Sequence, residues 1–230
     1  MFNTLVVAGA SRGIGLAVAT HLALKSHRLL AVSRTLAPVG EWVSADLSSL
    51  SGVETTAKAV GSDVLDALLY MGGTWETNAF TPQYNFEHCA DEDITQVIKV
   101  NLVAPIRLVK ALLPALRRSA NPKIIFMGAL SGLDNFPARE VANSASKFGL
   151  RGVVHALREE LRSQQISVTV INPGNVGTPE VLEDLGKNTL LGGKAIPLSD
   201  LLSIIDCILS LSRETCLKEI DVAAMLGNGA

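Results

Sequence analysis

Lys147 and Asn143 are the residues whose types and spacing first raise the question of chemistry. Both lie in "VANSASKFGLRG", residues 141–152, a stretch with the pattern of a helix. Residues four apart share one face of a helix, so these side chains are expected to lie together. A lysine can lower the pKa of a neighbouring acid, but the Asn143 amide does not titrate and cannot act as a general acid by itself. We therefore expect a polar centre around Lys147 whose proton donor is not evident from these residues.

A second chemical signal is the glycine-rich stretch "AGASRGIG", residues 8–15. Its glycines allow a tight turn and a close approach of the backbone to a diphosphate. The stretch lies between a strand pattern and a helix pattern, so the free N–H groups and positive dipole end of that helix would face the ligand. A tight turn without a ligand is the alternative. We predict nucleotide binding here, with contacts from Gly9, Ser11, Arg12, Gly13, Ile14 and Gly15.

Arg34 follows the second strand pattern, in "VSRT", and determines which nicotinamide cofactor we expect. A carboxylate at this place accepts from the ribose 2′-hydroxyl of NAD, whereas an arginine accommodates the 2′-phosphate of NADP. Arg12 would supply a second guanidinium for the same phosphate. The alternative is that both arginines are solvated surface residues. The sequence therefore predicts a preference for NADP(H) over NAD(H).

Alternating strand and helix patterns must position these residues. Strand patterns are expected at 4–10, 28–34, 41–46, 64–73, 122–129, 166–174 and 218–225, and helix patterns at 13–26, 51–60, 91–118, 143–163 and 199–212. This alternation predicts an α/β fold with a Rossmann-type doubly wound parallel sheet in three layers, forming a single domain over residues 1–230. Two polar stretches, 74–90 and 175–198, follow strand ends, where open α/β sheets bind ligands. We expect them to form the wall of a small-molecule substrate site.

Composition excludes several function classes. The chain has 230 residues, of which 48% are hydrophobic and 18% charged, and its net charge is −2. Disorder is therefore not expected, nor is attraction to nucleic acid or an anionic membrane. The three cysteines are scattered without metal-ligand spacing, so we expect reduced thiols and no metal site. The start "MFNTLVVAGAS" has a strand pattern rather than that of a signal peptide, and a cytoplasmic location is expected.

Several motifs resemble the short-chain dehydrogenase/reductase family over almost the whole chain. They are the G-x-x-x-G-x-G turn, "SADL" at 44–47, "LLYMGG" at 68–73, "VNLVAPIRLVKALLP" at 100–114 and "INPGNVGT" at 171–178. The resemblance places Asn101 on the family's structural and proton-relay asparagine. It implies further cofactor residues, which are Asp46 and Leu47 near the adenine, Gly72 and Gly73 after the fourth strand, Lys147 at the nicotinamide ribose, and Pro173, Gly174, Val176 and Thr178 at the nicotinamide amide.

The catalytic centre departs from the family pattern. The family uses an acid–base tyrosine, a lysine four residues later that lowers its pKa, and a serine that orients the substrate carbonyl. Lys147 matches the lysine, but Asn143 stands at the position of the tyrosine and Ala129 at that of the serine. Ser131 would reach the centre only through a shifted loop, and is otherwise an ordinary loop serine.

Three functions remain open at this point. The first is an NADP(H)-dependent oxidoreductase that acts on a small carbonyl or related substrate. Its substitute proton donor would be Tyr84, His88, Ser131, Ser144 or a water ordered by Lys147 and Asn101. The second is a non-redox enzyme that reuses the pocket, and the third is a catalytically inactive nucleotide-binding pseudoenzyme or regulatory subunit. By resemblance, the two longest helix patterns would form the interfaces of a homodimer or homotetramer.

Overall fold

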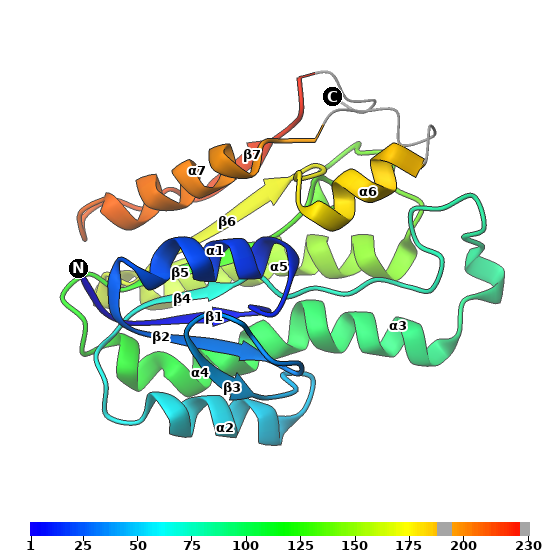
Figure 1. Cartoon of the computed structure of the whole chain (residues 1–230). Helices are drawn as coiled ribbons and strands as arrows, with labels where there is room; N and C mark the ends of the chain where they lie inside the picture. Colours follow the sequence, from blue (N-terminus) through cyan, green and yellow to red (C-terminus); the bar gives the residue numbers. More distant parts are fainter. Residues whose placement is uncertain (188–194, 226–230) are drawn as a thin grey trace.

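Seven parallel strands form the centre of the molecule (Figure 1). The computed structural model describes residues 1–187 and 195–225. Within them the strand order is β3-β2-β1-β4-β5-β6-β7, which is the doubly wound arrangement that the sequence predicts. The strands are β1 Phe2–Ala8, β2 Ser26–Ser33, β3 Glu41–Ser44, β4 Leu65–Tyr70, β5 Lys123–Met127, β6 Ser167–Pro173 and β7 Glu219–Val222.

Helices cover both faces of the sheet and give the fold its three layers (Figure 1). They are α1 Gly13–Ala23, α2 Leu50–Val60, α3 Asp91–Ile98, α4 Ala104–Leu116, α5 Val141–Leu161, α6 Pro179–Lys187 and α7 Leu198–Ser210. Among the described residues, none of the helices combines the length and the apolarity that crossing a membrane would need.

Each face of the sheet has its own apolar core, because successive strand residues point to opposite sides. Val6 of β1 packs in the core beneath α2, α4 and α5, whereas Leu5 and Val7 pack in the core beneath α1 and α7. Every residue of β5 and of β6 is buried, as expected for strands that helices cover on both faces. The near-continuous apolar runs that predict these strands in the sequence therefore reflect double burial.

The long helix pattern at 91–118 is confirmed, with an interruption that the sequence does not reveal. Five residues, Lys99–Val103, form a π-helical turn between α3 and α4. Such turns insert an extra residue into the helix and often lie at functional sites. Here the π turn carries Asn101, which is the buried residue of that turn.

The structure moves some predicted boundaries. The pattern at 13–26 predicts a longer first helix, but α1 ends at Ala23, and Ser26 already begins β2. β1 ends at Ala8 because Gly9 turns the chain with a φ of +84°. The stretch 175–198, predicted as a loop, contains α6, which starts at Pro179, a residue well suited to the first turn of a helix. Part of that stretch, 188–194, lies outside the described residues.

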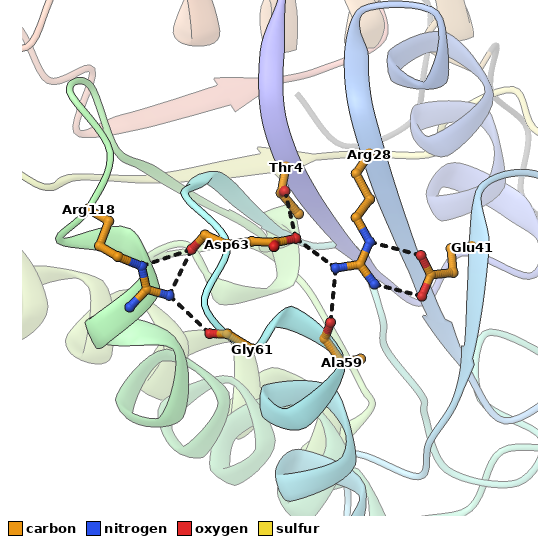
Figure 2. A network of polar contacts seen from close by, with 7 residues as sticks. All are labelled: Thr4, Arg28, Glu41, Ala59, Gly61, Asp63 and Arg118. Atoms are coloured by element: carbon orange, nitrogen blue, oxygen red, sulfur yellow. Dashed lines mark hydrogen bonds and ion pairs between the residues drawn. The ribbon is translucent and has the colours of Figure 1, made fainter.

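A network of polar contacts ties the strands together at their amino ends, opposite the glycine turn (Figure 2). Arg28 of β2 donates to both carboxylate oxygens of Glu41 at 2.8 and 2.7 Å, and to Asp63 at 2.6 Å. Asp63 also accepts from Thr4 of β1 at 3.1 Å, and its backbone carbonyl accepts from Arg118. One guanidinium therefore joins β2 and β3 to the turn that precedes β4.

We expect Arg28→Gln to lower the free energy of unfolding by about 1–2 kcal/mol at pH 7, since it removes charge-assisted hydrogen bonds that are partly exposed. The hydrogen bond from Arg28 holds the pKa of Glu41 and of Asp63 below their ordinary values. This stabilisation is present above about pH 4, where such carboxyls titrate in the unfolded chain. It is lost as the pH falls through the lower pKa values that Glu41 and Asp63 have in the folded protein. Urea unfolding at pH 7 and pH 3 should show the difference shrinking at pH 3.

The matched control is Arg162→Gln, because Arg162 forms an exposed ion pair with Glu159 within one helical stretch. Pairs of this kind contribute little. Equal losses for the two variants at pH 7 would contradict the role given to Arg28.

Candidate functional site

Four neighbouring strands bring the predicted site segments to one edge of the sheet. β1, β4, β5 and β6 lie side by side, and each ends at this edge. The glycine turn follows β1, Gly72 and Gly73 follow β4, the Ser131 turn follows β5, and the segment up to Thr178 follows β6. The fold thus gathers residues that are widely separated in the sequence, at the edge where open α/β sheets bind ligands.

The glycine turn requires its three glycines for different reasons. A Cβ on Gly9 would lie 2.6 Å from the Cα of Gly72, and a Cβ on Gly15 would lie 2.0 Å from the Gly9 carbonyl oxygen. Gly13 has open space around it but a φ of +55°, which L side chains rarely adopt. The turn is therefore folded tightly against the end of β4.

The start of α1 has the features of an anion site. The side chain of its N-cap residue, Arg12, does not cap this helix, and its first turn carries no acidic residue. Its amides and dipole are thus left for other partners. The carboxyl of Glu180, at the start of α6, lies close by. Its pKa is lowered chiefly by its own backbone amide, with Thr178, the Gly13 amide and Arg12 adding to the effect. A negative charge is therefore favoured at this corner, and the residues present fit a nucleotide diphosphate.

The two arginines predicted to select the cofactor are exposed beside this corner. Arg34 directly follows β2, and Arg12 directly precedes α1. In the part of the chain that the structure describes, neither forms an ion pair with an acidic side chain, although Arg12 lies close enough to Glu180 to help lower the pKa of that carboxyl.

Asp46 and Leu47 follow β3 at the same edge. The Asp46 carboxylate accepts from the backbone and hydroxyl of Ser48, at 3.0 and 2.8 Å. The Asp46 side chain is exposed, and Leu47 packs partly into the core beneath α2. Asp46 thus orders the turn into α2.

Asn101 fixes the chain that leaves β4. Its Oδ1 accepts from the Thr74 amide at 2.9 Å, and its Nδ2 donates to the Thr74 carbonyl at 2.8 Å and to Ser146 Oγ at 3.1 Å. Both amide protons of Asn101 are therefore engaged. The π turn places Asn101 between β4 and α5, which explains how one side chain reaches both.

Lys147 is buried in α5, with only 9% of its surface exposed. Its Nζ donates to the Met127 carbonyl at 3.0 Å. Burial lowers the pKa of Lys147 to about 8. A Cβ on Gly73 would lie 3.8 Å from Nζ and 3.7 Å from Asn101 Oδ1, so these two polar groups meet beside Gly73. The centre therefore contains an amine that exchanges its proton close to neutral pH.

The structure brings Ser131 to Asn143. Asn143 Nδ2 donates to Ser131 Oγ at 3.3 Å, and both residues are buried. From the sequence, Ser131 is expected to reach the centre only through a shifted loop. The 3₁₀ turn Leu130–Gly132 provides that loop. Gly132 allows this turn to approach α5, because a Cβ there would lie 2.9 Å from Lys147 Cβ.

The remaining candidate proton donors differ in their surroundings. Tyr84 is buried, its hydroxyl accepts from the Val141 amide at 3.1 Å, and burial raises its pKa. His88 is exposed in the 3₁₀ turn Phe86–His88. Ser144 Oγ is buried and forms no hydrogen bond in the described part of the chain. Tyr84 thus accepts a hydrogen bond from the first residue of α5, the helix that carries Asn143 and Lys147.

Glu76 is the site residue that sequence reasoning missed. It is 1% exposed, and its Oε1 accepts from the amides of Ala142 and Asn143 at 2.7 and 3.2 Å. Its Oε2 is buried without a hydrogen-bond partner among the described residues. The signal for such a residue is indirect. In "EVANS", where α5 begins, the N-cap residue Glu140 does not cap the helix with its own side chain. A missing local cap implies a distant one.

The segment after β6 is held in place by backbone contacts. The Gly174 amide donates to the Val222 carbonyl at 2.8 Å, and Val176 forms an isolated bridge with Ile196. Thr178 is buried, and its Oγ1 accepts from the Val181 amide at 3.4 Å, at the start of α6. Pro173 ends β6, so the predicted nicotinamide segment starts from a fixed point.

Comparisons with known proteins agree with this arrangement. A family model for short chain dehydrogenase matches residues 3–188. The 3-dehydrosphinganine reductase TSC10A of Arabidopsis thaliana is 31% identical over 193 residues, which cover 77% of this chain but only 57% of that protein. Carbonyl reductase family member 4 of Xenopus laevis is 29% identical, with 86% of this chain and 84% of that protein covered. A solved metagenomic short-chain oxidoreductase in complex with NADP has a TM-score of 0.76 at 26% identity, with 97% of each chain covered.

We expect Gly132→Ala to lower the free energy of unfolding by about 1–3 kcal/mol, because the new methyl would press on the backbone of α5. Gly152→Ala is the matched control. Gly152 lies within α5 with open space around it. Alanine there should stabilise the protein by about 0.5–1 kcal/mol. Urea unfolding of both variants measures this, and a neutral Gly132→Ala would mean that the Ser131 turn does not depend on close contact with α5.

Proposed function

The chain belongs to the short-chain dehydrogenase/reductase family, and on this basis we propose that it is an NADP(H)-dependent oxidoreductase that reduces a small carbonyl compound. The observation that carries the proposal is the buried amine of Lys147, with its pKa lowered to about 8, beside the Ser131–Asn143 pair. This centre provides a proton source and a carbonyl-orienting hydroxyl at the edge that carries the glycine turn.

The cofactor would be held by residues of this edge. The amides of the glycine turn, including those of Ser11 and Ile14, would bind the diphosphate, and Arg12 and Arg34 the 2′-phosphate. By the family resemblance, Asp46, Leu47, Gly72 and Gly73 would border the adenosine half, and Lys147 and the segment 173–178 the nicotinamide half. When bound, NADPH supplies the hydride.

The protein's own residues would manage the substrate oxygen and its proton. Ser131 accepts from Asn143, which leaves the serine proton free to donate to a substrate carbonyl. The Lys147 ammonium would deliver a proton to that oxygen, directly or through a water, and would then recover one from solvent. Loss of a positioned general acid typically costs about 10²–10⁴-fold in rate. We therefore propose slow but real turnover.

A second candidate function follows from Asn143 itself. By the resemblance it replaces the acid–base tyrosine, so the chain would bind NADPH without turnover, as an inactive regulatory subunit or as a non-redox enzyme that reuses the pocket. Asn143→Tyr separates these readings. A gain of NADPH oxidation in that variant, with none in wild type over a broad carbonyl panel, would favour a degraded reductase.

The assembly and location are part of the proposal. We propose a homodimer or homotetramer in the cytoplasm, formed through α4 and α5 as in the family. Ile106 of α4 and Phe148 of α5 are exposed large apolar residues on those helices. Burying such residues against a second copy removes apolar surface from water.

We expect Arg34→Ala to weaken NADPH binding by about tenfold or more, since a charge-assisted contact to the 2′-phosphate is lost. NADH binding should stay within about twofold, because NADH lacks that phosphate. Fluorescence titration of wild type and variant with both nucleotides measures the change. Comparable affinity of wild type for NADH and NADPH would refute the assignment.

We expect carbonyl reduction to fall as pH rises through about 8, because the Lys147 ammonium loses its proton there. Below that pH the ammonium is fully present, so kcat/KM should level off. Lys147→Met should abolish both the pH step and most of the rate. The measurement is NADPH oxidation between pH 6 and 10, and a variant that keeps the wild-type profile would remove Lys147 from the mechanism.

A further inference from the structure

The buried carboxylate of Glu76 does more than cap a helix. Helix starts are ordinarily capped by Ser, Thr, Asp or Asn at the N-cap, through one oxygen. α5 instead uses Glu76, which lies 66 residues before Ala142, and one of its two oxygens accepts from the amides of both Ala142 and Asn143. The other, Oε2, is buried without a partner in the described part of the chain. An unpaired buried oxygen destabilises the fold, so its retention points to a ligand.

Glu76 belongs to the stretch 74–90, which several hydrogen bonds join to the start of α5. The Phe80 amide donates to Glu140 Oε1 at 2.9 Å, and Arg139 donates to the Tyr84 carbonyl at 3.2 Å. Together with the Tyr84 hydroxyl on the Val141 amide, these contacts join the stretch 74–90 to the helix start in both directions. Glu76 is therefore held at a fixed place next to Asn143.

The surroundings of Glu76 are negative. Burial raises the pKa of Tyr84, and the carboxylates of Glu76 and Glu140 add to that rise. Burial also raises the pKa of Cys89, with Glu76 and Asp93 contributing. Within residues 1–187 and 195–225, no lysine, arginine or histidine side chain forms an ion pair with Glu76 or Glu140. A cation brought to this wall would thus meet carboxyl groups that backbone amides contact but no cationic side chain pairs.

Two aromatic rings stand exposed on the same wall. Trp75 and Phe80 are 56% and 43% exposed, and their rings meet edge to face with centroids 5.8 Å apart. Exposed aromatic faces attract ammonium groups through cation–π contacts. Phe80 is held there with a φ of +61°, an uncommon conformation for a bulky residue.

We propose that Glu76 is a specificity-determining residue that selects carbonyl substrates carrying an ammonium group. The N–H groups of the ammonium would donate to Oε2, and Trp75 and Phe80 would contact its charged end. This inference rests on the proposed reductase function, and it names the substrate class of the same site.

The test compares two series of linear methyl ketones, in which an ammonium group replaces the terminal methyl group in one series. For at least one chain length, wild type should show about tenfold or higher kcat/KM for the ammonium ketone, chiefly through KM. Glu76→Gln keeps an acceptor oxygen for the α5 amides but loses the charge, so the ratio should fall to about one. Glu87→Gln, at an exposed acid of the same stretch, is the control and should keep the wild-type ratio.

Two outcomes would overturn the inference. One is a ratio at or below one for every chain length in wild type, and the other is a preference that survives Glu76→Gln. If Glu76→Gln does not fold, Trp75→Leu takes its place, and it should reduce the preference by removing the ring.

Failure of the proposed function is recognised separately. If neither ketone series oxidises NADPH, ligand binding is measured instead, as the change in the Tm of the protein on addition of butylammonium chloride or of butanol. A rise in Tm with butylammonium that exceeds the rise with butanol, and that Glu76→Gln removes, would uphold the ammonium site without turnover. Equal shifts for both probes would overturn it.

Discussion

The burial of Lys147 is the constraint on which the rest of the site depends. An amine that is removed from water favours its neutral form unless a carboxylate compensates, and here a single backbone carbonyl supports it. Gly132 permits close contact with α5 at this point, because a Cβ there would lie 2.9 Å from Lys147 Cβ, and Gly73 lies on the side of the amine. The π turn at Asn101 completes the enclosure by tying Thr74 to Ser146. The packing of the backbone around Lys147 thus lowers the pKa of its ammonium group.

Much of the fold follows from local sequence, because buried parallel strands read as apolar runs and the glycine turn has a steric origin. The 3₁₀ turn that carries Ser131 to Asn143 could not be predicted, since it depends on contact between Gly132 and a helix later in the chain. Glu76 was missed for the same reason, because a cap supplied from a distant stretch leaves no short-range pattern. α6 was missed because it is only 9 residues long and lies in a stretch rich in Gly, Thr and Pro.

The stretch 74–90 and α5 behave as one unit. Glu76 and Tyr84 satisfy the first amides of α5, and Glu140 returns a contact to Phe80. The expected substrate wall is therefore fixed to the helix that carries Asn143 and Lys147. Any group that displaces Glu76 would also disturb the Asn143 backbone, so recognition at the wall and geometry at the centre are mechanically linked.

If Asn143 stands at the position of the family's tyrosine, as the sequence resemblance implies, the proposed chemistry changes less than the loss of a phenol suggests. Hydride transfer belongs to the cofactor, and the protein must supply orientation and a proton. Asn143 retains orientation, because its amide donates to Ser131 and leaves the serine hydroxyl free to donate onward. Under the proposed function, Lys147 would supply the proton, because burial lowers its pKa to about 8. In a family where lysine assists a tyrosine, this arrangement would give Lys147 the proton-donating role of that tyrosine, and the burial of the amine would act on the substrate directly.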